Sequence, residues 1–365
     1  MKEQTLTLRQ LNRATLARQF LLNRTNISAF DVITHLVGLQ AQTSNAPYIG
    51  LWTRLQDFQR DSLTALIEHR RVVRATLMRS TLHLMTAEDY VQFRATLQPA
   101  LTRALKAFFG QRAKGLDVER IVTAAQAYVK EQPHTFPEIR SELTLLEPEK
   151  EPELLAYAVR THLPLVQLPP GGTWGFTGSP LHVTAESWLE RPLCLSEELH
   201  TLILRYLAAF GPASVQDMQT WSGLSGLKGI VEALKPQLCT YQDEQGNILF
   251  DLPDMQLPPD DIPAPPRFLP EFDNLILSHA KRQRVVADAY RPSIFLSAGR
   301  VRATFLIDGF VSGTWKTTRE KGVATLIVEP FVPLSDQDRN ALIEEGERLI
   351  RFIEDKAEKF IIQVQ

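Results

Sequence analysis

The chain has 365 residues, of which 44% are hydrophobic and 22% charged, with a formal net charge of −2. This size and composition predict a globular protein of two to four domains, and the lack of any run of about 18 apolar residues excludes a hydrophobic transmembrane helix. The N-terminal segment MKEQTLTLRQ lacks the apolar core of a signal peptide, and the two cysteines exclude a disulfide framework. We therefore expect a cytoplasmic protein.

The charges are distributed unevenly along the chain. Residues 1–120 carry 17 Lys and Arg against 9 Asp and Glu, whereas residues 121–270 carry 9 against 19. A second basic region, residues 281–321, holds nine cations and three acidic residues. This pattern fits a polyanion such as DNA lying across part of the surface, although solvated faces of unrelated elements explain it equally well.

Residues 1–115 are expected to form helices followed by a β-ribbon. Ser28 and Asp31 form a capping signal before the apolar run VITHLVGLQ. After a helix over SLTALIEHR, the β-rich runs RVVRATLM and TLHLM stand almost adjacent, which predicts a tight ribbon. Helices followed by such a ribbon are typical of a winged helix.

The same order of elements recurs twice, in residues 116–192 and 193–254. The second copy ends in a Gly-rich ribbon, LVQLPPGGTWGFTGSPLHVT, and the third in a hairpin with EQGN at its turn. The copies share no residue-level identity, so the repeat is one of architecture. The sequence thus predicts three tandem winged-helix domains.

Residues 255–365 are expected to form a separate C-terminal unit. A Pro-rich connector, LPDMQLPPDDIPAPPRFLP, should be extended. Beyond it, alternating apolar and polar residues predict a small antiparallel β-barrel or sheet, and Ser335 with Asp338 should cap a C-terminal helix that runs to Phe360. The expected fold class is α+β.

Common catalytic signatures are missing from the sequence. The eight histidines are scattered singly, and neither cysteine lies near one of them, so we expect no metal site and no cysteine nucleophile. There is no Walker A motif and no G-x-S-x-G. The Gly-rich run LPPGGTWGFTG lacks a strand-turn-helix context and is interpreted as a wing tip. No cofactor is expected.

The segment GLQAQTSNAPY, residues 38–48, is the clearest candidate for chemistry. Gln40 and Gln42 stand two residues apart, so in an extended backbone both amides point the same way. Such a pair could hold one water molecule or one face of a sugar. The alternative is that both are solvated polar residues at the end of a helix.

Four segments in this order give the sequence a family resemblance: GLQAQ, MRSTLHLMTAEDY, FLPEFDNLILSH and DGFVSGTW. Together they are similar to the winged-helix DNA glycosylase family of AlkZ and YcaQ, over nearly the whole chain. The resemblance implies three winged-helix domains and a small β-barrel around duplex DNA. It also implies excision of alkylated bases, including interstrand crosslinks, without metal or organic cofactor. In the AlkZ branch a Gln-aliphatic-Gln motif is catalytic, which assigns that role to Gln40 and Gln42, with Ala41 small for the position between them.

The chemistry of two glutamines agrees with this implication. A glutamine amide cannot deprotonate water, so the pair would be a poor catalyst for removing a normal base. Alkylation at N7 of guanine or N3 of adenine makes the leaving base cationic and already weakens its bond to the sugar. Amide oxygens can then orient water and stabilise positive charge on the sugar in the transition state.

Further residues are expected to contact DNA rather than to act in catalysis. On the first wing these are Arg79, Thr81 and His83, and in the C-terminal unit they are Lys281, Arg282, Arg284, Lys316 and Arg319. The arginines suit phosphates because they are always charged and can bind bidentately. For His83 the alternative is a hydrogen-bonded structural histidine, and for the C-terminal cations it is plain surface charge.

Two other classes of function remain open from the sequence. Winged helices are more often non-catalytic DNA-binding regulators than enzymes, and they also serve as scaffolds for protein contacts. Regulators are usually symmetric dimers, whereas three unlike copies in one chain better suit a clamp around one lesion. We expect a monomeric, monofunctional glycosylase acting on double-stranded DNA, since no motif places a lysine for a Schiff-base step.

Overall fold

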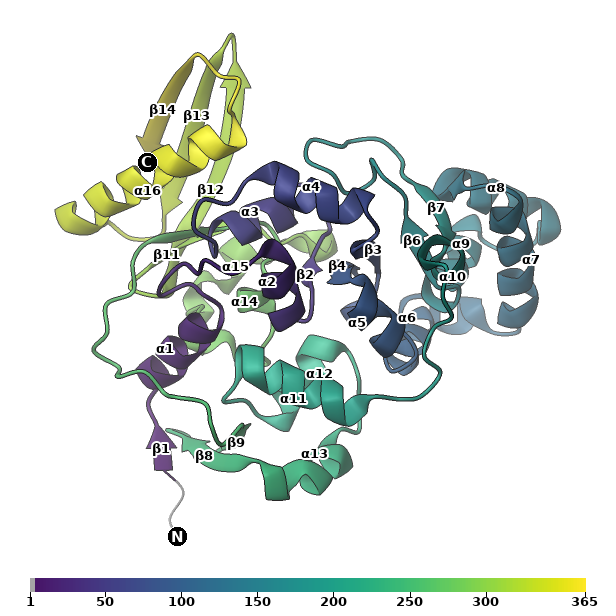
Figure 1. Ribbon diagram of the computed structural model, residues 1–365, viewed down its shortest axis with the longest axis horizontal. Coiled ribbons are helices and arrows are strands. Elements are labelled where there is room, and N and C mark those ends of the chain that lie inside the picture. Colours follow the sequence, from purple (N-terminus) through teal and green to yellow (C-terminus); the bar gives the residue numbers. More distant parts are fainter. Residues whose placement is uncertain (1–3) are drawn as a thin grey trace.

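The computed structural model describes residues 4–365, which form an α+β fold with three separate β-sheets (Figure 1). The elements of the first predicted unit, in chain order, are β1 (Gln4–Leu6), α1 (Leu8–Arg18), α2 (Ala29–His35), β2 (Leu39–Gln40), α3 (Ala46–Trp52), α4 (Arg60–Glu68), β3 (Val72–Thr76), β4 (Leu82–Thr86), α5 (Ala87–Phe93) and α6 (Gln98–Phe109). The capping signal is confirmed, because the Ser28 side chain accepts a hydrogen bond from the backbone N–H of Asp31 and begins α2. The predicted ribbon is the antiparallel pair β3–β4.

The second predicted unit does not form a sheet of its own. Its elements are α7 (Val118–Glu131), β5 (His134–Thr135), α8 (Phe136–Leu146), α9 (Pro152–His162), β6 (Leu165–Gln167), β7 (Leu181–Thr184) and α10 (Ala185–Leu189). Strand β6 pairs with β3 through Ala75 and Val166, so the two predicted wings merge into one six-stranded sheet of order β2-β4-β3-β6-β7-β5. This pairing covers the edge of β3 that a free ribbon would expose. Helices α7, α8 and α9 form a lobe beside this sheet (Figure 1).

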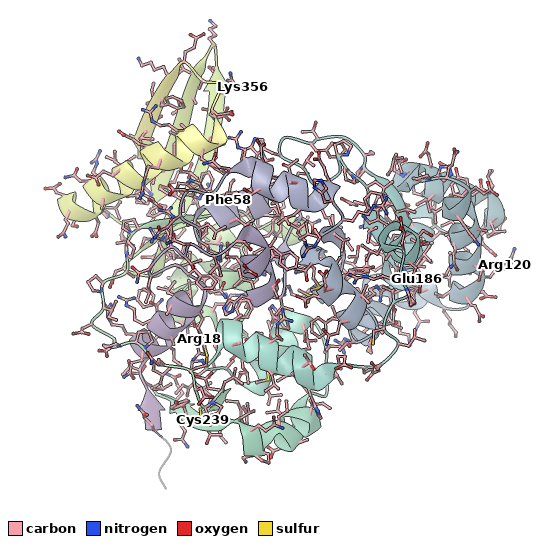
Figure 2. The ribbon with its side chains drawn as sticks, viewed as in Figure 1. Arg18, Phe58, Arg120, Glu186, Cys239 and Lys356 are labelled. Atoms are coloured by element: carbon pink, nitrogen blue, oxygen red, sulfur yellow. The ribbon has the colours of Figure 1, made fainter. Side chains whose placement is uncertain are left out.

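The third predicted unit contains the expected hairpin and also borrows a strand from the N-terminus. It comprises α11 (Leu199–Phe210), α12 (Val215–Ser222), α13 (Lys228–Leu234), β8 (Cys239–Asp243) and β9 (Ile248–Asp251). Strand β1 pairs with β8 in parallel, with Gln4 opposite Tyr241. A buried ion pair of 2.7 Å between Arg18, labelled in Figure 2, and Asp251 joins α1 to the end of β9. The sheets therefore cross the predicted domain boundaries, and the division into three winged-helix domains stays a prediction.

The C-terminal unit is an open sheet, which is one of the two expected alternatives, and a barrel is not found in residues 4–365. Its strands are β10 (Arg267–Leu269), β11 (Thr304–Ile307), β12 (Phe310–Glu320), β13 (Val323–Pro330) and β14 (Lys359–Val364), hydrogen-bonded in chain order. The expected antiparallel pairing is found from β10 to β13, whereas β14 runs parallel to β13. Helix α16 (Asp336–Ile353) begins at the predicted cap but ends before Phe360, whose segment KFIIQV has the β-branched and aromatic content of a strand.

The segment FLPEFDNLILSH enters the centre of the molecule. Its start belongs to β10, and Asn274–Leu277 form the short helix α14. Asp273, at the cap of α14, makes a buried bidentate ion pair with Arg54. Asn274 Nδ2 donates a 3.0 Å hydrogen bond to the carbonyl oxygen of Gly38, two residues before Gln40. This segment therefore fixes the approach to the Gln-Ala-Gln motif. A second short α-helix in this part of the chain is α15 (Arg291–Ile294).

The largest hydrophobic core joins the first and third predicted units. It contains the fully buried rings of Phe93, Tyr206, Phe210 and Trp221, with Tyr206 and Trp221 centroids 4.9 Å apart. Separate clusters lie under the C-terminal sheet and between the helices of the α7–α9 lobe. In residues 4–365 we find no helix long and apolar enough to cross a membrane.

Candidate functional site

Gln40 is the last residue of β2 and lies at the edge of the six-stranded sheet. It stands directly opposite His83 of β4, and only 6% of its surface is exposed. The backbone reaches this position through Gly38, whose φ is +94°. A side chain at Gly38 would also place its Cβ 2.9 Å from the carbonyl oxygen of Leu84, so glycine is required there.

The amide of Gln40 is held by an arginine. Arg79 Nη2 donates to Gln40 Oε1 at 2.7 Å and lies 3.3 Å from His83 Nε2, while Nη1 donates to the carbonyl oxygen of Trp221. A guanidinium only donates hydrogen bonds, so the oxygen of the Gln40 amide and a bare nitrogen of His83 face Arg79. The other ring nitrogen of His83, Nδ1, then donates to the Thr81 carbonyl oxygen at 3.0 Å. Gln40, Arg79 and His83 thus form one polar cluster.

The charge of this cluster resides on the arginine alone. Burial and the neighbouring Arg79 lower the pKa of His83 to about 3, so the imidazole is neutral at pH 7. Burial, and then the charge of Arg282, lower the pKa of Arg79 to about 10, which still leaves it charged. Arg79 adopts a left-handed backbone conformation, φ +54°, in the 3-10 turn Met78–Ser80 between β3 and β4. This turn directs its side chain inward, onto Gln40.

Gln42 lies in a different setting from Gln40. The strand ends at Gln40, so the extended backbone that would align both amides does not continue through Gln42. Gln42 is exposed, and its Oε1 lies 3.4 Å from the backbone nitrogen of Leu82, which donates to it. The Gln42 amide therefore contacts β4 at Leu82, whereas the Gln40 amide is bonded to Arg79 in the turn before β4.

A second arginine, Arg74 of β3, holds the backbone of the motif. Its Nε and Nη2 donate to the Ala41 carbonyl oxygen at 2.9 and 2.7 Å, and Nη2 also donates to that of Gln42 at 3.2 Å. Nη1 donates to Oε1 of Gln167. Burial lowers the pKa of Arg74 to about 10. Arg74 was not predicted from the sequence, although a lone arginine inside the apolar run VVRATLM was a signal for it.

Five of the eight expected DNA contacts are wholly or partly committed to protein contacts. Arg79 and His83 belong to the polar cluster with Gln40, and His83 is fully buried, so the expectation that His83 contacts DNA is corrected. The other three are Arg284, Arg282 and Thr81. Arg284 is 5% exposed and donates to the Pro212 carbonyl oxygen at 2.9 Å, so it is too deeply buried to reach a phosphate, and this expectation is corrected. Arg282 is half-buried, with its guanidinium 4.4 Å from the centre of the Phe295 ring. Thr81 is half-buried and donates to the Met78 carbonyl oxygen.

The remaining expected contacts lie at the surface. Lys281, Lys316 and Arg319 have side chains that are 57%, 54% and 43% exposed. Lys316 pairs with Glu329 at 3.1 Å. These three cations, unlike Arg79 and Arg284, are free to exchange their present partners for a phosphate, and their contact with DNA stays a prediction.

Similarity to known proteins agrees with the family resemblance of the sequence. Residues 33–352 match the family described as DNA glycosylase AlkZ-like. The chain is 25% identical over 357 residues to a Streptomyces sahachiroi protein named "Interstrand DNA cross-link repair glycosylase", covering 88% of this chain and 90% of that protein. Its fold is similar to the solved structure of Streptomyces sahachiroi DNA glycosylase AlkZ, with a TM-score of 0.79 and 20% identity over 99% of this chain and 100% of the other. The chain belongs to the AlkZ-like family of DNA glycosylases.

Proposed function

We propose that the protein is a monofunctional DNA repair glycosylase that hydrolyses the N-glycosidic bond of cationic alkylated purines and leaves an abasic site. N7-alkylguanine is the representative substrate, and interstrand crosslinks made through such purines belong to the same class. The observation that carries the proposal is the orientation of the Gln40 amide by Arg79, next to a neutral His83. A fixed amide dipole without a carboxylate suits this reaction, because the alkylated base is already cationic and its bond to the sugar is already weakened.

The reaction needs only one water molecule besides the damaged nucleotide. The bond between C1′ and the purine nitrogen breaks, and its electron pair neutralises the cationic base as it leaves. The sugar then carries oxocarbenium-like positive charge, which the amide oxygens of Gln40 and Gln42 stabilise. Water held by these oxygens adds to C1′, and its proton goes to solvent. Oε1 of Gln40 has a second lone pair for this role beyond the one that Arg79 occupies.

Duplex DNA is the proposed partner, bound by a monomer in the cytoplasm. The exposed Lys281, Lys316 and Arg319 are proposed to contact phosphates, with Arg282 and Thr81 as further DNA contacts. Lys316 would exchange Glu329 for a phosphate oxygen. Because such surface pairs contribute little to stability, the exchange costs little free energy.

One assay tests this function. The protein is incubated with a duplex that contains a single N7-methylguanine, the free base is measured by chromatography, and strand breaks are measured before and after hot alkali. We expect release of methylguanine, with breaks only after alkali, because hydrolysis leaves an intact abasic strand. Sequence-specific binding of undamaged duplex without base release would instead identify a non-catalytic regulator.

A further inference from the structure

A cavity of about 220 Å³ opens beside Gln42. Its walls come from β3 and β4 of the first predicted unit and from β6, β7, α8 and α9 of the second. Seven polar residues line it: Gln42, Arg74, Thr76, Arg160, Gln167, Ser179 and His182. No aspartate or glutamate is among the lining residues that the structure describes. The cavity, which we call the Arg74–Arg160 cavity, is therefore positively charged.

The charge of Arg74 lacks an anionic partner. Its guanidinium contacts the neutral oxygens of Ala41, Gln42 and Gln167, and within residues 4–365 no carboxylate lies at ion-pair distance from it. Only 7% of the Arg74 surface is exposed. Buried arginines are ordinarily paired with an acid, because an unpaired buried charge is costly. An anion bound in the cavity would supply the missing partner.

Arg160 provides a second unpaired cation at the same cavity. It is exposed on α9, with its Cζ 4.9 Å from the centre of the Phe136 ring, and no hydrogen bond or ion pair joins its guanidinium to the described residues. Stacking on a ring leaves the N–H groups at the edge of a guanidinium available to an anion. Nearby, Nδ1 of the buried His182 also makes no hydrogen bond with the described residues. Burial and the charge of Arg160 lower the pKa of His182 to about 4, so its ring is neutral.

We propose that the Arg74–Arg160 cavity binds a phosphodiester of the damaged DNA strand, next to the nucleotide whose sugar lies at Gln42. The inference rests on the proposed function. A cationic alkylated base does not fit, because two arginines would repel it, whereas the two non-bridging oxygens of a phosphodiester match the donors of a guanidinium. Arg74 also holds the carbonyl oxygens of Ala41 and Gln42, so the residue that attracts the strand is the one that positions the catalytic motif.

Uncharged phosphate analogues test this site. Duplexes carry one stable abasic-site analogue and a single methylphosphonate, placed in turn at each linkage around it. For the wild type we expect binding to weaken about tenfold at one linkage near the analogue and little at the others. Arg160→Gln should weaken binding of the all-phosphate duplex about tenfold, lower the slope of log K against log salt by about one, and show no further loss at that linkage.

A matched arginine controls for general electrostatics. Arg120 lies on α7 at the outer side of the same lobe (Figure 2) and pairs with Glu147 at 2.8 Å. Arg120→Gln changes the net charge by the same amount as Arg160→Gln. In this variant a methylphosphonate at the sensitive linkage should still weaken binding as much as it does in the wild type. Two results would overturn the proposal. One is that the loss of affinity caused by Arg160→Gln and the loss caused by the methylphosphonate are independent, and so multiply, at every linkage. The other is that Arg160→Gln and Arg120→Gln bind the all-phosphate duplex with the same affinity. Because Arg160 is exposed, its variant should fold, which circular dichroism checks.

Two further results are informative. One distinguishes a site for free phosphate from a site for a DNA phosphodiester, and the other distinguishes the proposed site from the proposed glycosylase function. If inorganic phosphate binds the wild type but not Arg160→Gln, while every methylphosphonate duplex binds as tightly as unmodified DNA, the cavity is a free-phosphate site and the proposal is overturned. The binding assay uses an analogue that cannot be cleaved, so it does not depend on catalysis. A wild type that fails to release methylguanine but passes the linkage test would overturn the proposed function and support the phosphodiester site.

Discussion

Arg79 and Gln40 are joined by a 2.7 Å hydrogen bond from Nη2 to Oε1, across the pairing of β2 with β4. The same guanidinium reaches the Trp221 carbonyl oxygen at the end of α12. One arginine therefore links the amide of the proposed catalytic residue to the third predicted unit. Its left-handed backbone in the turn between the strands makes this reach possible.

Arg79→Met should lower kcat of base release by up to about 100-fold and change KM by less than about threefold, because a misplaced amide loses transition-state interactions. The residue is a positioning residue, so the split between kcat and KM is the diagnostic readout. Arg103→Met is the control, since Arg103 also donates to this region, at Gly223 and Ser225, without touching Gln40. Equal losses in both variants, or a loss confined to KM, would contradict the assignment.

His83 should make the protein sensitive to acid. Its folded-state pKa is about 3, against 6.5 for an ordinary histidine. Above pH 6.5 the ring is neutral in both states, so it adds no pH dependence. As the pH falls from about 6.5 to 3, only the unfolded chain takes up the proton, and the free energy of unfolding decreases, by about 2 kcal/mol at pH 5.

Urea unfolding at pH 7 and at pH 5 measures this effect. His83→Gln should be less stable than the wild type at pH 7 but should lose about 2 kcal/mol less on acidification. His200→Gln, which changes an exposed histidine, should keep the wild-type difference between the two pH values. An unchanged acid sensitivity in His83→Gln would show that His83 is not the buried neutral base described above.

Asp273→Asn should destabilise the fold by about 3–5 kcal/mol, because it leaves the charge of Arg54 buried without its partner. Both oxygens of Asp273 accept hydrogen bonds from Arg54, at 2.8 and 2.9 Å, and both side chains are at most 3% exposed. The matched control is Glu153→Gln, which breaks an exposed pair with Arg140 and should cost less than about 1 kcal/mol. The stability of both variants is measured from their denaturant midpoints at pH 7. Equal shifts of the two midpoints would contradict the prediction that Asp273→Asn costs more stability than Glu153→Gln.

Features encoded by neighbouring residues could be predicted from the sequence. Ser28 and Ser335 begin helices because each cap and its partner lie three residues apart. The EQGN turn joins β8 and β9 for a similar reason, since residues 244–247 alone favour the reversal. The pair Gln40 and Gln42 was found from its spacing and from the family resemblance, although its catalytic role stays a prediction.

Features that depend on distant pairing could not be predicted. The partner of β1 lies in β8, far along the chain, and β3 of the first wing pairs with β6 of the second. The role of Arg79 depends on a left-handed turn and on an acceptor at Trp221, neither of which leaves a local pattern. Arg284 was expected at the surface because a basic run resembles a phosphate-binding segment, but the fold buries it against Pro212.

The single-turnover rate of N7-methylguanine release by the double variant Gln40→Ala/Gln42→Ala tests the central claim most directly. We predict a loss of at least about 100-fold, because both amide dipoles that would face the sugar are removed, while affinity for the duplex changes by less than about threefold. Gln59→Ala removes an exposed amide that, within residues 4–365, is bonded only to the Asp57 carbonyl oxygen, and it should release the base at the wild-type rate. A double variant that releases methylguanine as fast as the wild type would contradict the claim that these two amides perform the hydrolysis.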